Sequence, residues 1–251
     1  MNAIIEESTT ADPNYISDLL AVGDSKHALS AWCFTTVFNG RSVADFATLL
    51  ALGGTSLGHA RVLFQYLVNY GFDYDHLERG RRAEDIHAMA VLDRPPQSWP
   101  DLLAAIFAAE AAIKALTTGF LDGSDRQGGL LLKKIHQEQY FHQLYVKGWA
   151  EAFEAEEQAE FVSCLGARAA LANEWIGPAE QDDSTHVSGL RKTSNKEVHA
   201  LFNKELNGIY QLLEVAIELP KRKISDAWDR RRRRAGAIPD GLFQHMRVGE
   251  Q

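Results

Sequence analysis

Apolar residues recur at three- and four-residue steps along most of this chain, and strand-like alternation is almost absent. This spacing places apolar side chains on one face of a helix. We expect six main helices, at about residues 15–38, 42–70, 98–121, 126–153, 154–175 and 195–219. The pattern therefore predicts an all-α fold in which these helices form a bundle.

Residues with turn and capping chemistry separate the apolar segments. Asn39-Gly40 ends the first segment, and Gly23 is a candidate position for a break within it. Ser42 can cap the second helix, Gly71 can stop it, and Ser98 followed by Trp-Pro-Asp is a strong start for the third. These signals predict where the helices begin and end.

Longer polar stretches lie between and after the helices. Residues 72–97 form a long crossover with a short helical piece at 82–91, and residues 177–193 are expected to be a loop. We divide the chain into a flexible N-terminus (1–14), a helical domain with additional C-terminal helices (15–219) and a basic tail (220–251).

Composition and charge exclude several classes of protein. The net charge of -8 argues against general nucleic-acid binding. With two cysteines, Cys33 and Cys164, a disulfide framework is not expected and a reducing cytoplasm fits. We expect no secretory signal and no membrane span, because charged residues interrupt every apolar run. Phosphate-binding loops, nucleophile elbows and zinc-finger spacings are also missing.

Three polar residues stand on apolar helical segments, namely His59, Glu110 and His142. Two imidazoles and one carboxylate from three helices can hold one metal ion and leave positions open for oxygen and substrate. His27 on the first helix is a possible fourth ligand, and Lys26 is a less plausible residue for that place. The catalytic residues themselves cannot be assigned from these positions.

A two-metal site in a helical bundle has a stricter pattern. It needs a Glu or Asp on each of two helices and Glu-x-x-His on each of the other two. Here Ser56 and Gln139 occupy the acidic slots before His59 and His142, so one carboxylate, Glu110, would have to offset the charge of two metal ions. A conventional di-iron centre is therefore not expected.

Several segments resemble one known family, the phenylacetic acid catabolic proteins, which are ferritin-like subunits of the phenylacetyl-CoA oxygenase (epoxidase). The resemblance covers roughly residues 15–175. It is carried by residues 29–33 (LSAWC), 57–66 (LGHARVLFQY), 138–142 (EQYFH), 147–149 (KGW) and 173–175 (NEW).

The resemblance implies a ferritin-like bundle and a part in oxygenating an aromatic or acyl-CoA-like substrate. The family contains a catalytic subunit with a complete di-iron site and a related subunit whose site has decayed and which scaffolds the complex. A catalytic chain would bind iron and take electrons from a separate reductase. A structural chain would pair with a homologous ferritin-like subunit, or with further copies of itself.

Two interpretations of the polar residues remain open. In the first, His59, Glu110 and His142 hold one iron ion. In the second, they are remnants, and Ser56 and Gln139 satisfy the histidines through hydrogen bonds without any ion. Glu138, one helical turn before His142, would in either case lie next to the site rather than in it.

Two further groups of residues have alternative interpretations. Trp32, Phe64 and Phe107, together with Phe34, either line a pocket for an aromatic substrate or simply belong to the core. The run Arg230–Arg234 is either a solvated tail or a docking patch for an acidic partner or for the phosphates of a coenzyme A thioester.

Overall fold

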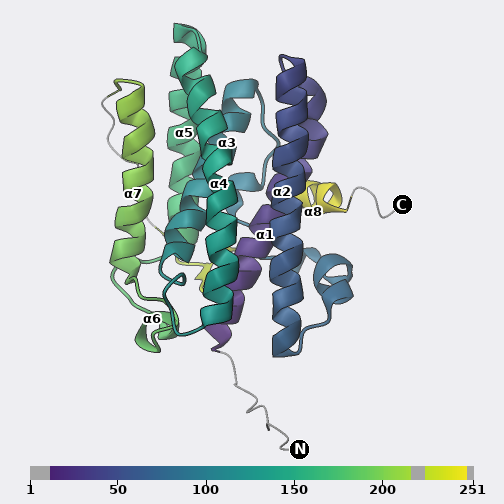
Figure 1. The fold of residues 1–251 in the computed structure, drawn as a ribbon, viewed down its shortest axis with the longest axis vertical. Helices are drawn as coiled ribbons and strands as arrows, with labels where there is room; N and C mark the ends of the chain where they lie inside the picture. Colours follow the sequence, from purple (N-terminus) through teal and green to yellow (C-terminus); the bar gives the residue numbers. More distant parts are fainter. Residues whose placement is uncertain (1–11, 216–223, 248–251) are drawn as a thin grey trace, which may run out of the picture.

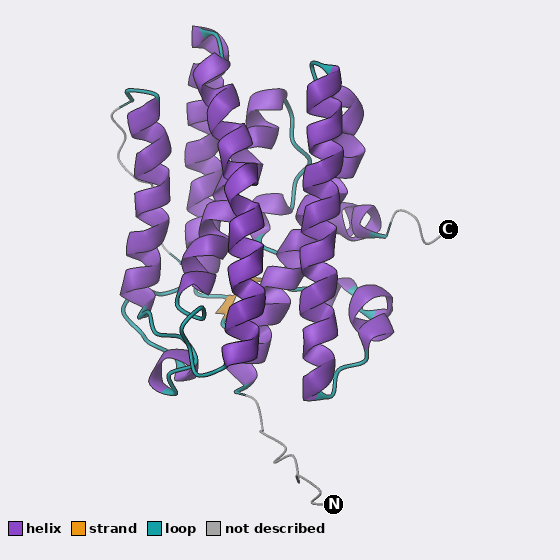
Figure 2. Cartoon of the chain, in the orientation of Figure 1, coloured by secondary structure: helices purple, strands orange, loops and turns teal. Residues whose placement is uncertain are grey.

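A computed structural model of the chain describes residues 12–215 and 224–247. The prediction of a flexible N-terminus falls almost entirely outside these residues, as does the predicted end of the sixth helix. Figures 1 and 2 show a bundle of long helices, which confirms the all-α prediction.

The long helices coincide closely with the predicted ones. They are α1 (Pro13–Thr36), α2 (Val43–Leu67), α3 (Trp99–Thr118), α4 (Arg126–Ala152), α5 (Ala155–Ile176) and α7 (Asn195–Leu212). The described residues also contain two shorter helices, α6 (Ser184–Val187) and α8 (Asp240–Met246), and two paired strands of two residues each, β1 (Trp228–Asp229) and β2 (Arg234–Ala235).

The predicted helix signals act as expected, with one exception. Ser42 Oγ accepts a hydrogen bond from the Asp45 backbone N–H at 3.1 Å, and Gly71 takes a left-handed conformation with φ 88°. Gly23 does not break α1. It lies where Phe64 of α2 packs, because a Cβ at this position would come within 2.8 Å of the Phe64 ring. The glycine therefore serves close helix packing rather than a bend.

Helix α3 is the centre of the bundle. It packs against α4, α5 and α7, and almost all of its side chains are buried. Helices α1 and α2 pack against each other along their length and close the other side of the core (Figure 1). A helix covered on all sides has no need of a polar face, and this explains the nearly unbroken apolar sequence of α3.

The crossover between α2 and α3 departs from the prediction. Instead of one helical piece at 82–91, it contains a π-helical turn (His76–Gly80) and 3₁₀ turns at Ala83–Asp85 and Ala90–Leu92. Side chains of α1 explain the interruption. The backbone N–H of His87 donates to Asp24 Oδ2 and that of Met89 to Ser25 Oγ, so neither N–H takes part in a helix.

The basic run near the C-terminus is folded onto the bundle, which corrects the expectation of a solvated or docking tail. Arg233 is 1% exposed, and both it and Arg230 bind Asp18 of α1. Arg234 is 5% exposed and forms an ion pair with Asp93 in the crossover. The guanidinium groups of Arg230, Arg233 and Arg234 neutralise Asp18 and Asp93, so they are not available to an outside ligand, whereas Arg231 is exposed.

No helix in the part of the chain that the structure describes is long and apolar enough to cross a membrane.

Candidate functional site

Glu110, in the middle of α3, is the centre of a buried polar cluster. Its side chain is fully buried, and both carboxylate oxygens accept hydrogen bonds from side chains of α1 and α4. Gln139 Nε2 donates to Oε2 at 2.5 Å, and His142 Nδ1 lies 2.7 Å from Oε1. Because an ionised carboxylate only accepts, this contact places the proton of the imidazole on Nδ1.

Lys26 of α1 supplies the charge that balances Glu110. Its Nζ lies 2.8 Å from Oε1 and 2.6 Å from Oε2, and neither side chain has any exposed surface. A buried charge of this kind is tolerated only when it is paired and hydrogen-bonded. The ammonium group therefore stands directly against the carboxylate that was expected to bind a metal ion.

The electrostatics of the cluster follow from this pair. Burial alone would raise the pKa of Glu110, but the Lys26 ammonium and the His142 imidazole hold it well below its ordinary range. Burial lowers the pKa of Lys26, and the Glu110 carboxylate opposes that shift. We interpret the two groups as an ion pair at neutral pH.

His59 of α2 is turned toward α4 rather than toward Glu110. Its Nε2 lies 2.7 Å from Glu138 Oε2, and the Glu138 side chain is 40% exposed. The rings of His59 and His142 lie 6.3 Å apart, centroid to centroid. Burial, reinforced by the positive charge of Lys26, lowers the pKa of His59 to about 4, so its ring is neutral near pH 7.

Ser56 and Gln139 do not pair with the histidines in the way one interpretation of the sequence proposed. Gln139 donates to Glu110 instead of His142, and Ser56 Oγ is buried without a hydrogen-bond partner. His59 Nδ1 and Gln139 Oε1 are also buried and unpartnered. The cluster thus contains neutral polar atoms that burial leaves unsatisfied.

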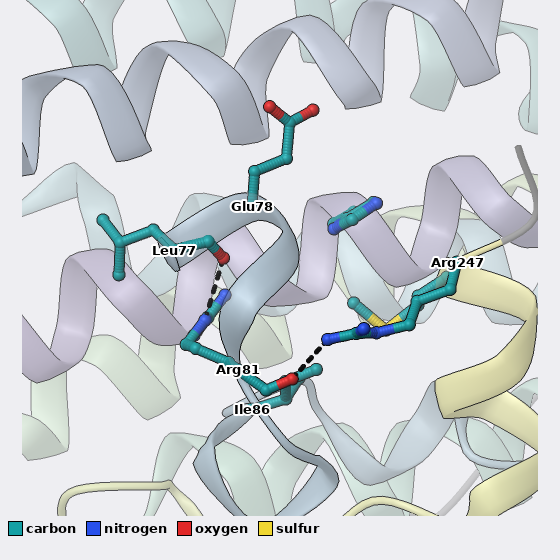
Figure 3. Close-up of a pocket in the computed structure, with 7 residues that line it drawn as sticks. Leu77, Glu78, Arg81, Ile86 and Arg247 are labelled. Carbon is teal, nitrogen blue, oxygen red and sulfur yellow. Dashed lines mark hydrogen bonds between the residues drawn. The ribbon is translucent and has the colours of Figure 1, made fainter. Parts of the chain in front are cut away.

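His27 lies in a different place from the other proposed ligands. It lines a small pocket with Leu77, Glu78, Arg81, Ile86, Met246 and Arg247 (Figure 3). Across this pocket Arg247 Nη2 donates to the backbone oxygen of Arg81, and Arg81 Nε donates to the backbone oxygen of Leu77 (Figure 3). The structure therefore does not bring His27 together with Glu110, although the two are on adjacent helices.

The aromatic residues proposed to bind substrate are core residues in this structure. Phe64 and Phe107 are fully buried, and Trp32 is 4% exposed. Trp32 Nε1 donates to the backbone oxygen of Leu92, so this side chain fastens the crossover to α1. None of the three lines the pocket shown in Figure 3.

Comparison with known proteins places the chain in a family. A family model described as phenylacetic acid catabolic protein matches residues 9–235. The chain belongs to this family. The family comprises subunits of iron-dependent, multi-subunit oxygenases of phenylacetate catabolism. A comparison with curated proteins finds no significant match.

The iron of this family does not fit the residues present. Lys26 contacts both oxygens of Glu110, His142 uses Nδ1 for the same carboxylate, and His59 uses Nε2 for Glu138. Among the described residues, no group of three or more His, Cys, Asp or Glu side chains is arranged to hold a metal ion. A metal ion beside Glu110 would have to displace an ammonium group of the same charge sign.

Lys26 is the residue whose role the sequence did not reveal. It stands one position before His27, which is the more usual metal ligand, and an isolated lysine on an amphipathic helix usually faces solvent. The residues that precede Lys26 in α1 are the signal that could have identified its role. Residues 15–26 of α1 are buried on every side, so a lysine there needs a buried carboxylate.

Proposed function

We propose that this chain is a non-catalytic structural subunit of the phenylacetyl-CoA oxygenase type, which supports a related subunit that carries the di-iron centre. The observation that carries the proposal is the ion pair between Lys26 and Glu110, with contacts of 2.6 and 2.8 Å. Lys26 of the same chain thus neutralises Glu110, the acidic residue that remains at the site. The bundle can then be stable without an ion, as a scaffold requires.

The polar residues around the pair support this proposal. In a two-metal bundle, the positions of Ser56 and Gln139 carry acidic residues that bridge or bind the ions. A hydroxyl and an amide are weak ligands for iron, and here they provide no negative charge. The alternative, in which His59, Glu110 and His142 hold a single iron ion and the chain is itself an oxygenase, requires the Glu110 carboxylate to exchange the Lys26 ammonium group for the ion.

Metal analysis separates the two proposals. The purified chain is reconstituted anaerobically with Fe(II), desalted and analysed for bound iron beside the variant His142→Gln, which keeps a hydrogen-bond donor for Glu110. We expect the same background iron content in both proteins. About one iron per chain in the wild type, lost in His142→Gln while the circular dichroism spectrum stays unchanged, would support the oxygenase and overturn the scaffold.

A further inference from the structure

An exposed helical face, formed by α2 and α4, has no partner among the residues that the structure describes. The two helices run antiparallel and are bridged by Asp45 with Tyr145 and Trp149 at one end and by Asp125 with Tyr66 at the other. Both lie on the near side of the bundle in Figure 1. Their outward surfaces therefore form one continuous face, which we call the α2–α4 face.

On α4, the outward residues are spaced as in a helix that packs against another helix. Steps of four and three residues connect the exposed positions Leu130, Lys134, Gln137, Phe141, Leu144 and Gly148. Leu130, Phe141 and Leu144 are 70%, 65% and 51% exposed, which is unusual for such large apolar side chains. Alternating steps of four and three are the spacing of helix–helix seams.

On α2, the outward residues of the same face are small. Ala47, Ala51, Gly54 and Gly58 follow the same alternating spacing, and all four are exposed. A Cβ added to Gly54 or Gly58 would meet no atom of the described residues within 4 Å, so neither glycine is needed for packing against them. Small residues allow a helix from another chain to approach the α2 backbone closely while large residues on α4 fill the space beside it.

Charge decides which partner suits this face. The chain is acidic, with a net charge of -8, yet α4 carries four basic residues and two acidic ones: Arg126, Lys133, Lys134 and Lys147 against Glu138 and Glu151. Lys133, Lys134 and Lys147 form no ion pair with any described residue, whereas Glu138 is engaged by His59. Two copies of the chain joined through this face would place lysines near lysines.

We propose that the α2–α4 face docks a pair of helices from a different chain, whose apolar stripe is bordered by Asp and Glu. This inference rests on the proposed function, because it assigns the surface by which the structural subunit holds its relative. Phe141 and Leu144 are the anchors, and the α2 glycines set the distance of approach. Lys133, Lys134 and Lys147 orient the partner and speed its encounter.

The test measures binding of the full-length chain to the family member from the same genome that has acidic residues at the positions of Ser56 and Gln139. Dissociation constants are measured by titration calorimetry. We expect Phe141→Asp and Leu144→Asp to weaken binding at least ~30-fold. Val187→Asp replaces a residue that is 80% exposed on α6, and it should leave binding within about twofold. Reversing two charges with Lys133→Glu/Lys134→Glu should weaken binding most at low salt.

Each outcome has a distinct meaning. A complex that tolerates Phe141→Asp and Leu144→Asp overturns the docking face and leaves the scaffold role intact. Failure of the wild-type chains to associate overturns the scaffold role itself. Sedimentation of the chain alone should show a monomer, and a dimer that Phe141→Asp dissociates would assign the face to self-association instead.

Discussion

Two carboxylates in this bundle, Asp125 and Glu110, are stabilised in different ways. Asp125 caps α4 and accepts hydrogen bonds from three tyrosine hydroxyls, Tyr15 at 2.7 Å, Tyr66 at 2.6 Å and Tyr70 at 3.2 Å. Glu110 lies in the middle of α3 and accepts from an ammonium group, an imidazole and an amide. The first carboxylate is satisfied by neutral donors and the second by a full opposite charge.

Position in the helix explains the difference. The Asp125 carboxylate lies at a helix N-terminus, where it accepts from the Gly128 N–H and where the helix dipole favours negative charge. It is also only partly buried. Glu110 has no free N–H groups nearby and no exposed surface, so hydrogen bonds from neutral donors alone would leave its charge uncompensated. A buried carboxylate in mid-helix therefore needs a cation, which here is Lys26.

The largest expected effect comes from removing that cation. Lys26→Met leaves an unpaired charge in the core and should lower the free energy of unfolding by about 3–5 kcal/mol. Urea denaturation at pH 7 measures this loss. The double variant Lys26→Met/Glu110→Gln removes both charges and should recover most of it. A loss below about 1 kcal/mol in the single variant would contradict the ion pair as the main stabilising contact of the cluster.

Acid should affect the stability of the Glu110 cluster more than that of the Asp125 cluster, because a neutral buried histidine, His59, lies beside the Glu110 cluster. The pKa of His59 is lowered from 6.5 to about 4, so the unfolded chain binds a proton there at higher pH than the folded chain does. Stability from this group is complete above pH 6.5 and falls as the pH drops toward 4, by about 3 kcal/mol. His59→Gln should reduce the slope of unfolding free energy against pH in this window, whereas Tyr66→Phe should leave the slope unchanged.

A smaller effect is expected at the Asp125 cluster. Asp125→Ala removes the cap of α4 and the shared acceptor of three hydroxyls, and should cost about 2 kcal/mol. Thermal and urea unfolding measure the change. If it equalled that of Lys26→Met, the distinction between neutral donors and a cation would lose its basis.

The smallest effect tests a single donor. Tyr66→Phe removes one of three hydroxyls around Asp125 and leaves the other two in place, so the free energy of unfolding should fall by about 1 kcal/mol. Because the three hydroxyls share one carboxylate oxygen, Tyr15→Phe offers a matched comparison. An effect above about 3 kcal/mol from Tyr66→Phe would mean that the neutral donors act as one cooperative unit.

Much of the bundle follows from local chemistry that can be read directly from the chain. Apolar periodicity predicts the helices, and Ser42, Gly71 and Ser98 predict their ends, because capping depends on neighbours a few residues away. The same periodicity places Glu110, Gln139 and His142 on inward faces, and the structure brings these three together. His59 reaches the same region but binds Glu138, which the one-turn spacing on α4 had placed next to the site.

Tertiary packing alone decides what lies opposite each of these residues. The rotation of α1 in the bundle points Lys26 at Glu110, while the adjacent His27 faces the pocket beside α8. The fold of the C-terminal segment pairs Arg233 with Asp18, two residues separated by most of the chain. Helical periodicity determines which face of a helix is buried. The partner of a buried charge depends on how separate helices rotate and pack, and the local sequence pattern of one helix does not specify this packing.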